Sequence, residues 1–156
     1  MVAVGQPAPD FTLYKDGATT MSLADFRGQN LVLFFFPKAF TGTCERQVST
    51  HAQAIDQFNA LDAQVVGVST DQTPTLAKFA ETCEAAGKVT LLSDFRHQAV
   101  QAYGVAVETG SLANQRAVFI IDRDGVVRYT HIEPAPSNYQ GVEPELAALK
   151  EIQGDK

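Results

Sequence analysis

The sequence has no tryptophan and only two cysteines, Cys44 and Cys83, which lie far apart in the chain. Because they form no CxxC pair, a disulfide oxidoreductase with a dithiol at a helix start is excluded. The three histidines are scattered and form no zinc-binding spacing with the cysteines, so we expect neither a metal nor a cofactor. Two isolated cysteines are typical of reduced thiols in a cytosolic protein.

Positive charge is also scarce, because 12 lysines and arginines face 18 aspartates and glutamates, for a net charge of −6. No basic cluster offsets this charge, so we expect no binding to nucleic acid. The longest apolar run, residues 31–36, is far shorter than the ~20 residues that a membrane-spanning helix needs. The first residues lack the basic and apolar regions of a signal peptide. We therefore expect a cytoplasmic protein without membrane contact.

The length of 156 residues is sufficient for one hydrophobic core, and we expect a single domain over residues 1–156. Apolar runs alternate with helical periodicity, which is typical of an α/β fold. The predicted strands are 31–36, 64–69, 89–92, 116–121 and 126–132, preceded by a hairpin at 14–21. The predicted helices are 22–28, 44–58, 74–86, a short one ending at 103, and 142–152.

The most informative stretch joins the first buried strand to the helix that follows it. Residues 31–36 are all hydrophobic, which predicts a strand covered on both faces, and Pro37 ends it because proline has no N–H for a ladder. Thr41 or Thr43 can cap the next helix, which places Cys44 in its first turn. The free N–H groups and the dipole of a helix start favour negative charge there, so this position suits a reactive thiolate.

Helical spacing places Cys44 on the side of this helix that faces the sheet. Starting from Cys44, apolar residues follow at intervals of three or four positions, which is the spacing of one helix face. These residues are Val48, Ala52, Ile55 and Phe58. His51 falls on the same face, where an apolar residue is expected. It lies two turns from Cys44, roughly 10 Å along the helix axis, which is too far for a general base. We interpret His51 as a structural residue.

The stretch around the cysteine resembles the active-site signature of peroxiredoxins, the thiol-dependent peroxidases. The signature is Pro37-x-x-x-Thr41-x-x-Cys44. Its surroundings are most similar to the AhpE-like one-cysteine branch and next to the bacterioferritin comigratory protein (peroxiredoxin Q) branch. Further matches are GQPAPDFTL at 5–13, LLSDF at 91–95, AYGV at 102–105 and Arg116 at a strand start. The resemblance implies a thioredoxin-like fold, with a central mixed sheet flanked by helices and an N-terminal β-hairpin extension.

The resemblance also implies roles for individual residues. Cys44 would be the peroxidatic nucleophile, and the Thr41 hydroxyl would bridge thiolate and peroxide. Arg116 would hold a permanent positive charge near the sulfur, and Pro37 would shield the sulfur from water. Peroxide attack would produce a sulfenic acid, which a thiol then reduces. Many relatives have an acidic residue three positions after the cysteine, whereas this chain has Gln47, which supplies no charge to orient Arg116.

Cys83 leaves two interpretations open. Some relatives of the comigratory-protein branch have a resolving cysteine in the corresponding helix, so the resemblance implies a Cys44–Cys83 disulfide. Cys83 also lies on the apolar face of its predicted helix with Leu76 and Phe79, where a free cysteine is typically a buried core residue. For Cys44, the alternative to a reactive thiolate is likewise an inert cysteine in the core.

The function that these residues indicate is reduction of hydrogen peroxide and organic hydroperoxides. The electron donor would be a thioredoxin-, glutaredoxin- or mycoredoxin-type protein or a small thiol, and family habit suggests a homodimer through the loops beside Cys44. The alternative from another class is a peroxide-sensing redox switch that signals to a partner protein. Turnover separates the two, because a sensor is oxidised once whereas an enzyme consumes peroxide continuously.

Overall fold

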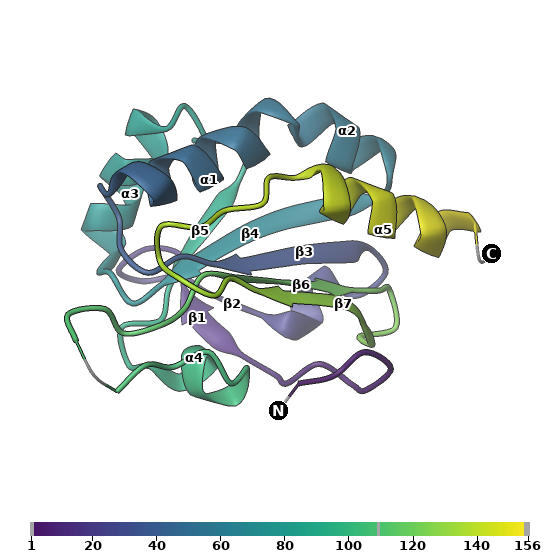
Figure 1. The fold of residues 1–156 in the computed structure, drawn as a ribbon, viewed down its shortest axis with the longest axis horizontal. Helices are drawn as coiled ribbons and strands as arrows, with labels where there is room; N and C mark the ends of the chain where they lie inside the picture. Colours follow the sequence, from purple (N-terminus) through teal and green to yellow (C-terminus); the bar gives the residue numbers. More distant parts are fainter. Residues whose placement is uncertain (1, 109, 155–156) are drawn as a thin grey trace.

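Seven strands form one mixed sheet in the order β2-β1-β5-β4-β3-β6-β7 (Figure 1). The computed structural model describes residues 2–108 and 110–154, so Met1, Thr109, Asp155 and Lys156 of the predicted domain lie outside the described residues. The strands are β1 (Thr12–Tyr14), β2 (Thr20–Ser22), β3 (Asn30–Phe35), β4 (Ala63–Ser69), β5 (Thr90–Ser93), β6 (Ala117–Ile121) and β7 (Val127–Ile132). β3, β4 and β5 run parallel, and the other neighbouring pairs are antiparallel.

Helices cover both faces of this sheet, as predicted. One face carries α1 (Gly42–Gln53), α2 (Ile55–Ala60), α3 (Thr73–Thr82) and α5 (Glu143–Gly154), and the other carries α4 (Gln98–Ala102) and the 3-10 helix η1 (Leu23–Phe26) (Figure 1). The hairpin β1–β2 extends the sheet beyond β5. Among the described residues, the structure contains no helix with the length and apolar character that crossing a membrane requires.

β3 lies at the centre of the sheet and contributes side chains to both hydrophobic clusters. Val32 and Phe34, together with Phe36 just after the strand, pack under α1, α2, α3 and α5. Leu33 and Phe35 face the opposite way, toward α4 and η1. Because successive residues of a strand point to opposite faces, an unbroken apolar run is what a strand covered on both sides requires. The prediction for residues 31–36 is therefore confirmed.

Two helices differ from the sequence-based expectation. The helix predicted over 44–58 is interrupted at Ala54, which leaves helical geometry (φ −94°, ψ 9°) and separates α1 from α2. The helix predicted over 74–86 ends at Thr82, because Glu84 adopts a left-handed conformation (φ 56°). The N–H of Ala85 then donates to the carbonyl of Ala80, which satisfies a free acceptor at the helix end.

Gly67, in the middle of β4, leaves space for the aromatic ring of Phe34. A Cβ atom at this position would lie 2.6 Å from Phe34 Cζ and 2.8 Å from Leu91 Cδ2, which is closer than packed atoms tolerate. The Phe34 ring in turn stacks on His51, with ring centroids 4.2 Å apart and planes 12° apart. Because Gly67 has no side chain, the stacked rings of Phe34 and His51 can pack directly against β4.

We predict that Gly67→Ala destabilises the fold by about 1–3 kcal/mol, the usual range for an extra methyl in a packed core. Urea unfolding of the variant measures this change in free energy. Gly17→Ala is the matched control, because a Cβ there would meet no atom within 4 Å. Equal unfolding free energies for the two variants would contradict the close approach of Phe34 to β4.

Candidate active site

Cys44 lies in the first turn of α1, which follows β3 after a turn of six residues, 36–41. The backbone N–H of Phe36 still donates to the Val68 carbonyl, and the buried Pro37 then ends the pairing. Thr41 is the N-cap residue of α1, so Cys44 is the third residue of the helix. The Cys44 side chain is only 1% exposed and belongs to the cluster under α1. The predicted inward orientation of Cys44 is confirmed.

The turn between Pro37 and Thr41 is held by Asp71, at the end of β4. Its carboxylate accepts hydrogen bonds from the backbone N–H of Ala39 (2.8 Å) and the hydroxyl of Ser69 (2.7 Å). Within the turn, Phe40 adopts a left-handed conformation (φ 63°). A bulky residue in this conformation is uncommon and persists where neighbouring contacts maintain it. Sequence reasoning missed Asp71, although an aspartate two residues after a predicted strand was visible.

Thr41 presents its hydroxyl to the backbone of the same turn. Thr41 Oγ1 donates to the carbonyl of Lys38 at 2.8 Å and makes no capping hydrogen bond to the helix. The residue is exposed, whereas Cys44 is buried. A hydroxyl that donates its proton in this way keeps its lone pairs free to accept a hydrogen bond from another molecule.

Arg116 reaches Cys44 from the strand on the other side of β3. Phe35 pairs with Ala117 in the antiparallel β3–β6 register, so Arg116 lies beside the residue that follows β3. Its side chain is buried, and Nη1 donates to Cys44 Sγ at 3.3 Å. The structure therefore brings together the two residues that are 72 positions apart in the sequence. A guanidinium this close favours negative charge on the sulfur.

Two further acceptors orient the Arg116 guanidinium. Nη1 also donates to Gln47 Oε1 at 2.6 Å, and Nη2 donates to the carbonyl of Pro136 at 2.7 Å. Gln47 supplies no charge, and its amide oxygen holds the guanidinium through a hydrogen bond instead. Sequence reasoning missed Pro136, since a backbone carbonyl in a loop has no signal in the sequence.

His51 is fully buried, and its two ring nitrogens have partners other than Cys44. Nδ1 lies 2.8 Å from the carbonyl of Gln47, and Nε2 lies 2.7 Å from Glu145 Oε1 in α5. Burial alone would lower the pKa of His51, but the Glu145 carboxylate and the Gln47 carbonyl outweigh it and leave the pKa raised. These contacts agree with the interpretation that His51 is not the base for Cys44.

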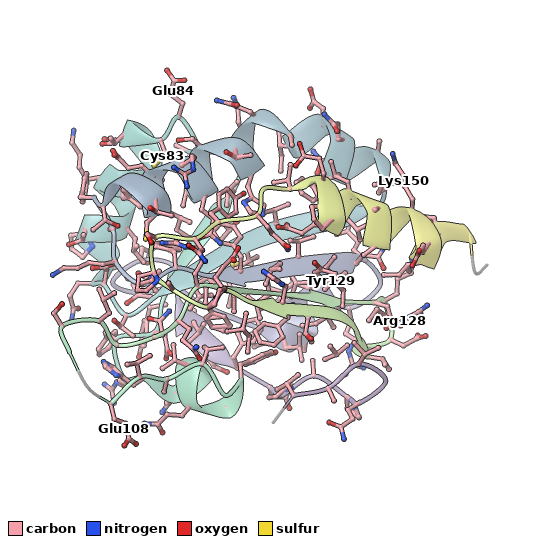
Figure 2. All side chains as sticks on the ribbon, in the orientation of Figure 1. Cys83, Glu84, Glu108, Arg128, Tyr129 and Lys150 are labelled. Carbon is pink, nitrogen blue, oxygen red and sulfur yellow. The ribbon has the colours of Figure 1, made fainter. Side chains whose placement is uncertain are left out.

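Cys83 is the C-cap residue of α3 and is 5% exposed. It lines a cavity of about 120 Å³ with residues of α1 that include Ser49. Figure 2 shows Cys83 next to Glu84 at the end of α3. Burial raises the pKa of the Cys83 thiol. A hydrogen bond with Ser49 lowers this pKa in part, whereas the charges of Glu45 and Cys44 raise it further. Both cysteines are free thiols in this structure.

A larger hollow, of about 380 Å³, lies beside Arg116 on the side of the segment that follows β7. Its lining includes apolar side chains from two loops, such as Val107, Leu112 and Pro134. Arg116 and Pro136 belong to the same lining. Arg116 therefore contacts the cysteine and also lines a mainly apolar hollow of the kind that ligands occupy.

Known proteins are similar to this chain in both sequence and architecture. The model of the AhpC/TSA family matches residues 4–130. Alkyl hydroperoxide reductase E of Mycobacterium tuberculosis is 37% identical over 136 residues, which cover 85% of this chain and 87% of that protein. Peroxiredoxin Bcp of Escherichia coli is 32% identical over 143 residues, which cover 88% of this chain and 90% of that protein.

The fold agrees with these sequence matches. A crystal structure of reduced Prx3 in complex with H2O2 from Vibrio vulnificus superposes with a TM-score of 0.85 at 29% identity. The match covers 98% of this chain and 99% of that one. The resemblance to the AhpE-like and comigratory-protein branches is thereby confirmed, as is the thioredoxin-like fold. The chain belongs to the AhpC/TSA family and is a peroxiredoxin, a thiol-dependent peroxidase.

Proposed function

We propose that Cys44 is the peroxidatic nucleophile of this peroxiredoxin. The observation that carries the proposal is the 3.3 Å contact between Arg116 Nη1 and Cys44 Sγ, in the buried first turn of α1. The Cys44 thiolate attacks the terminal oxygen of a hydroperoxide, so that an S–O bond forms and the O–O bond breaks. The sulfur loses two electrons and becomes a sulfenic acid. The alkoxide or hydroxide that leaves takes a proton from solvent and departs as alcohol or water.

Arg116, Thr41 and Pro37 assist this step in different ways. Arg116 stabilises the thiolate and the charge that develops on the peroxide oxygens, because its guanidinium is permanently protonated. Thr41 accepts a hydrogen bond from the terminal O–H of the peroxide, since its own proton is directed at Lys38. Pro37, buried beside the turn, limits the access of water to the sulfur.

Hydrogen peroxide and organic hydroperoxides are both proposed as substrates. The hollow beside Arg116 supports organic substrates, because its apolar lining from Val107, Leu112 and Pro134 suits a carbon chain. A relative of similar length is named alkyl hydroperoxide reductase E, and a similar structure was determined with H2O2. A peroxide-sensing switch is the less favoured alternative, since the relatives are named as peroxidases and reductases.

A thiol partner completes the cycle. The sulfenic acid of Cys44 condenses with a thiol, releasing water and forming a disulfide, which a second thiol then reduces. The partner is a thioredoxin-, glutaredoxin- or mycoredoxin-type protein; a relative in rat is named thioredoxin-dependent peroxide reductase. We place this reaction in the cytoplasm, in a homodimer formed through the loops beside Cys44.

Cys83 is the proposed internal thiol for this condensation. It lies in the same hydrophobic cluster as Cys44, and the Cys44 charge contributes to its raised pKa. Disulfide formation requires Cα atoms about 4.4–6.8 Å apart, so the first turn of α1 and the end of α3 unwind to bring the sulfurs together. The left-handed Glu84, directly after Cys83, makes the end of α3 a suitable place to open.

Cys44→Ser is predicted to abolish peroxide consumption and to leave the fold intact, because no other nucleophile is proposed. Peroxide loss with a panel of thiol reductants measures this, and circular dichroism monitors folding. Cys83→Ser is the control, since with a small external thiol it retains peroxide consumption. More than trace activity in Cys44→Ser would refute the assignment.

Arg116→Ala is predicted to slow the reaction of Cys44 with peroxide by tenfold or more, each ~1.4 kcal/mol of lost transition-state stabilisation being tenfold. Stopped-flow measurement of sulfenic acid formation gives the rate. Arg123→Ala, which removes an exposed arginine paired with Asp62, is the control and leaves the rate unchanged. Equal rates in the two variants would mean that the guanidinium is not part of the reaction.

Stoichiometric peroxide is predicted to link Cys44 to Cys83 within one chain, and a thioredoxin-type donor then reduces the bond. Peptide mapping by mass spectrometry after peroxide treatment detects the link. A Cys44 sulfenic or sulfinic acid with free Cys83 would instead support reduction by an external thiol alone. Full thioredoxin-driven turnover in Cys83→Ala would also support reduction by an external thiol alone.

A further inference from the structure

Two separate elements supply the acceptors that orient Arg116. Gln47 Oε1 belongs to α1, whereas the Pro136 carbonyl belongs to the segment 133–142 between β7 and α5. The guanidinium keeps its orientation toward Cys44 only if these two elements keep their relative position. The tie between α1 and the segment 133–142 is therefore part of the site.

The segment 133–142 is attached to the rest of the protein at both ends. At the β7 end, the N–H of Glu133 donates to the Arg116 carbonyl at 2.9 Å. At the other end the chain enters α5, and Glu145 in its first turn meets His51 of α1. Figure 1 shows the segment curving from β7 toward the start of α1 before it turns back into α5.

The His51–Glu145 contact is a buried ion pair. The partners of the two His51 nitrogens are a carbonyl and a carboxylate, both of which accept hydrogen bonds. Nδ1 therefore donates to the carbonyl, and the raised pKa of His51 favours the protonated ring, which donates from Nε2 to the carboxylate. Both side chains are at most 2% exposed, and charge-assisted bonds in such surroundings are about twice as strong as neutral ones.

Aromatic side chains from neighbouring elements enclose this pair. Phe34 of β3 and Phe58 of α2 stack on the His51 ring, with centroids 4.2 and 5.7 Å away. Tyr139 of the segment 133–142 covers it at 6.4 Å. Burial, followed by the charges of Glu145 and Glu143, raises the pKa of Tyr139, so its hydroxyl stays neutral. Glu145 thus supplies the counter-charge of His51.

We propose that the His51–Glu145 pair is a positioning device for Arg116, because it fastens the segment that carries the Pro136 carbonyl to the helix that carries Cys44 and Gln47. This inference rests on the proposed role of Cys44 and Arg116. Neither member of the pair touches the reacting atoms. This contact gives a role to His51 on the face of α1 where an apolar residue was expected.

The test compares two reactions of Cys44 in Glu145→Gln and Glu145→Ala. Peroxide reduction needs the oriented guanidinium, whereas alkylation by iodoacetamide at a pH where its rate is maximal needs only the thiolate. We expect the peroxide rate to fall by about threefold in Glu145→Gln and about tenfold in Glu145→Ala, the scale of one lost hydrogen bond to a charged group. The maximal alkylation rate stays unchanged in both. Glu143→Ala, in the same turn but exposed, is the control with wild-type rates.

A double-mutant cycle shows whether the pair acts through Arg116. In the Arg116→Ala background, Glu145→Ala should lower the peroxide rate no further, because the group that it positions is gone. If Glu145→Ala does not fold, the double variant His51→Leu/Glu145→Leu replaces the pair by apolar side chains, which cores often tolerate. We expect this double variant to lose peroxide rate as Glu145→Ala does and to keep the wild-type maximal alkylation rate.

Two results overturn the inference. One is a wild-type peroxide rate in a folded variant that lacks the pair. The other is an equal additional loss from Glu145→Ala in the Arg116→Ala background. Both are distinct from failure of the proposed function, which would appear as peroxide consumption by Cys44→Ser.

Discussion

The hydrogen bond from Arg116 to the sulfur of Cys44 is the contact on which the rest of this site depends. Burial of a guanidinium is costly without acceptors, and here a thiol, an amide and a backbone carbonyl accept hydrogen bonds from its two Nη atoms. The sheet positions both partners, because a short turn leads from the end of β3 into the helix that holds Cys44, and its antiparallel neighbour β6 begins just after Arg116. The register of two central strands thus sets the distance between charge and nucleophile.

Around this contact, buried polar groups beside α1 form a continuous series of hydrogen bonds. Gln47 connects the guanidinium to the helix through its amide, and its carbonyl meets the His51 ring. His51 continues the series to Glu145 in α5. Gln47 brings no negative charge, so the positive charge of Arg116 is left for the sulfur and the peroxide. The buried carboxylate at the far end is balanced by His51 instead. Charge is therefore compensated locally at each end of the series.

The strand, Pro37 and the inward-facing Cys44 could be predicted because they depend on local patterns: an apolar run, a residue without an N–H, and helical spacing. The fold class followed from the same patterns and from the resemblance. The Pro136 carbonyl could not be predicted, since any residue supplies a carbonyl and only the tertiary fold decides where it lies. The early end of α3 depends on the left-handed conformation of Glu84, which the residue type does not indicate. The sequence indicates that the Gln47 amide can form hydrogen bonds, but only the tertiary fold decides that its partner is Arg116.

The long separation in sequence between Cys44 and its partners has a consequence for synthesis of the protein. Arg116 follows Cys44 by 72 residues, and Glu145 follows His51 by 94. A ribosome therefore makes the nucleophile long before the residues that surround it, and α5 comes last. Until Arg116 has been added and β6 has paired with β3, Cys44 has no guanidinium beside it. Until the segment 133–142 is in place, that guanidinium lacks the Pro136 carbonyl. The contacts that surround the sulfur and orient its arginine therefore come together only after most of the chain has been made.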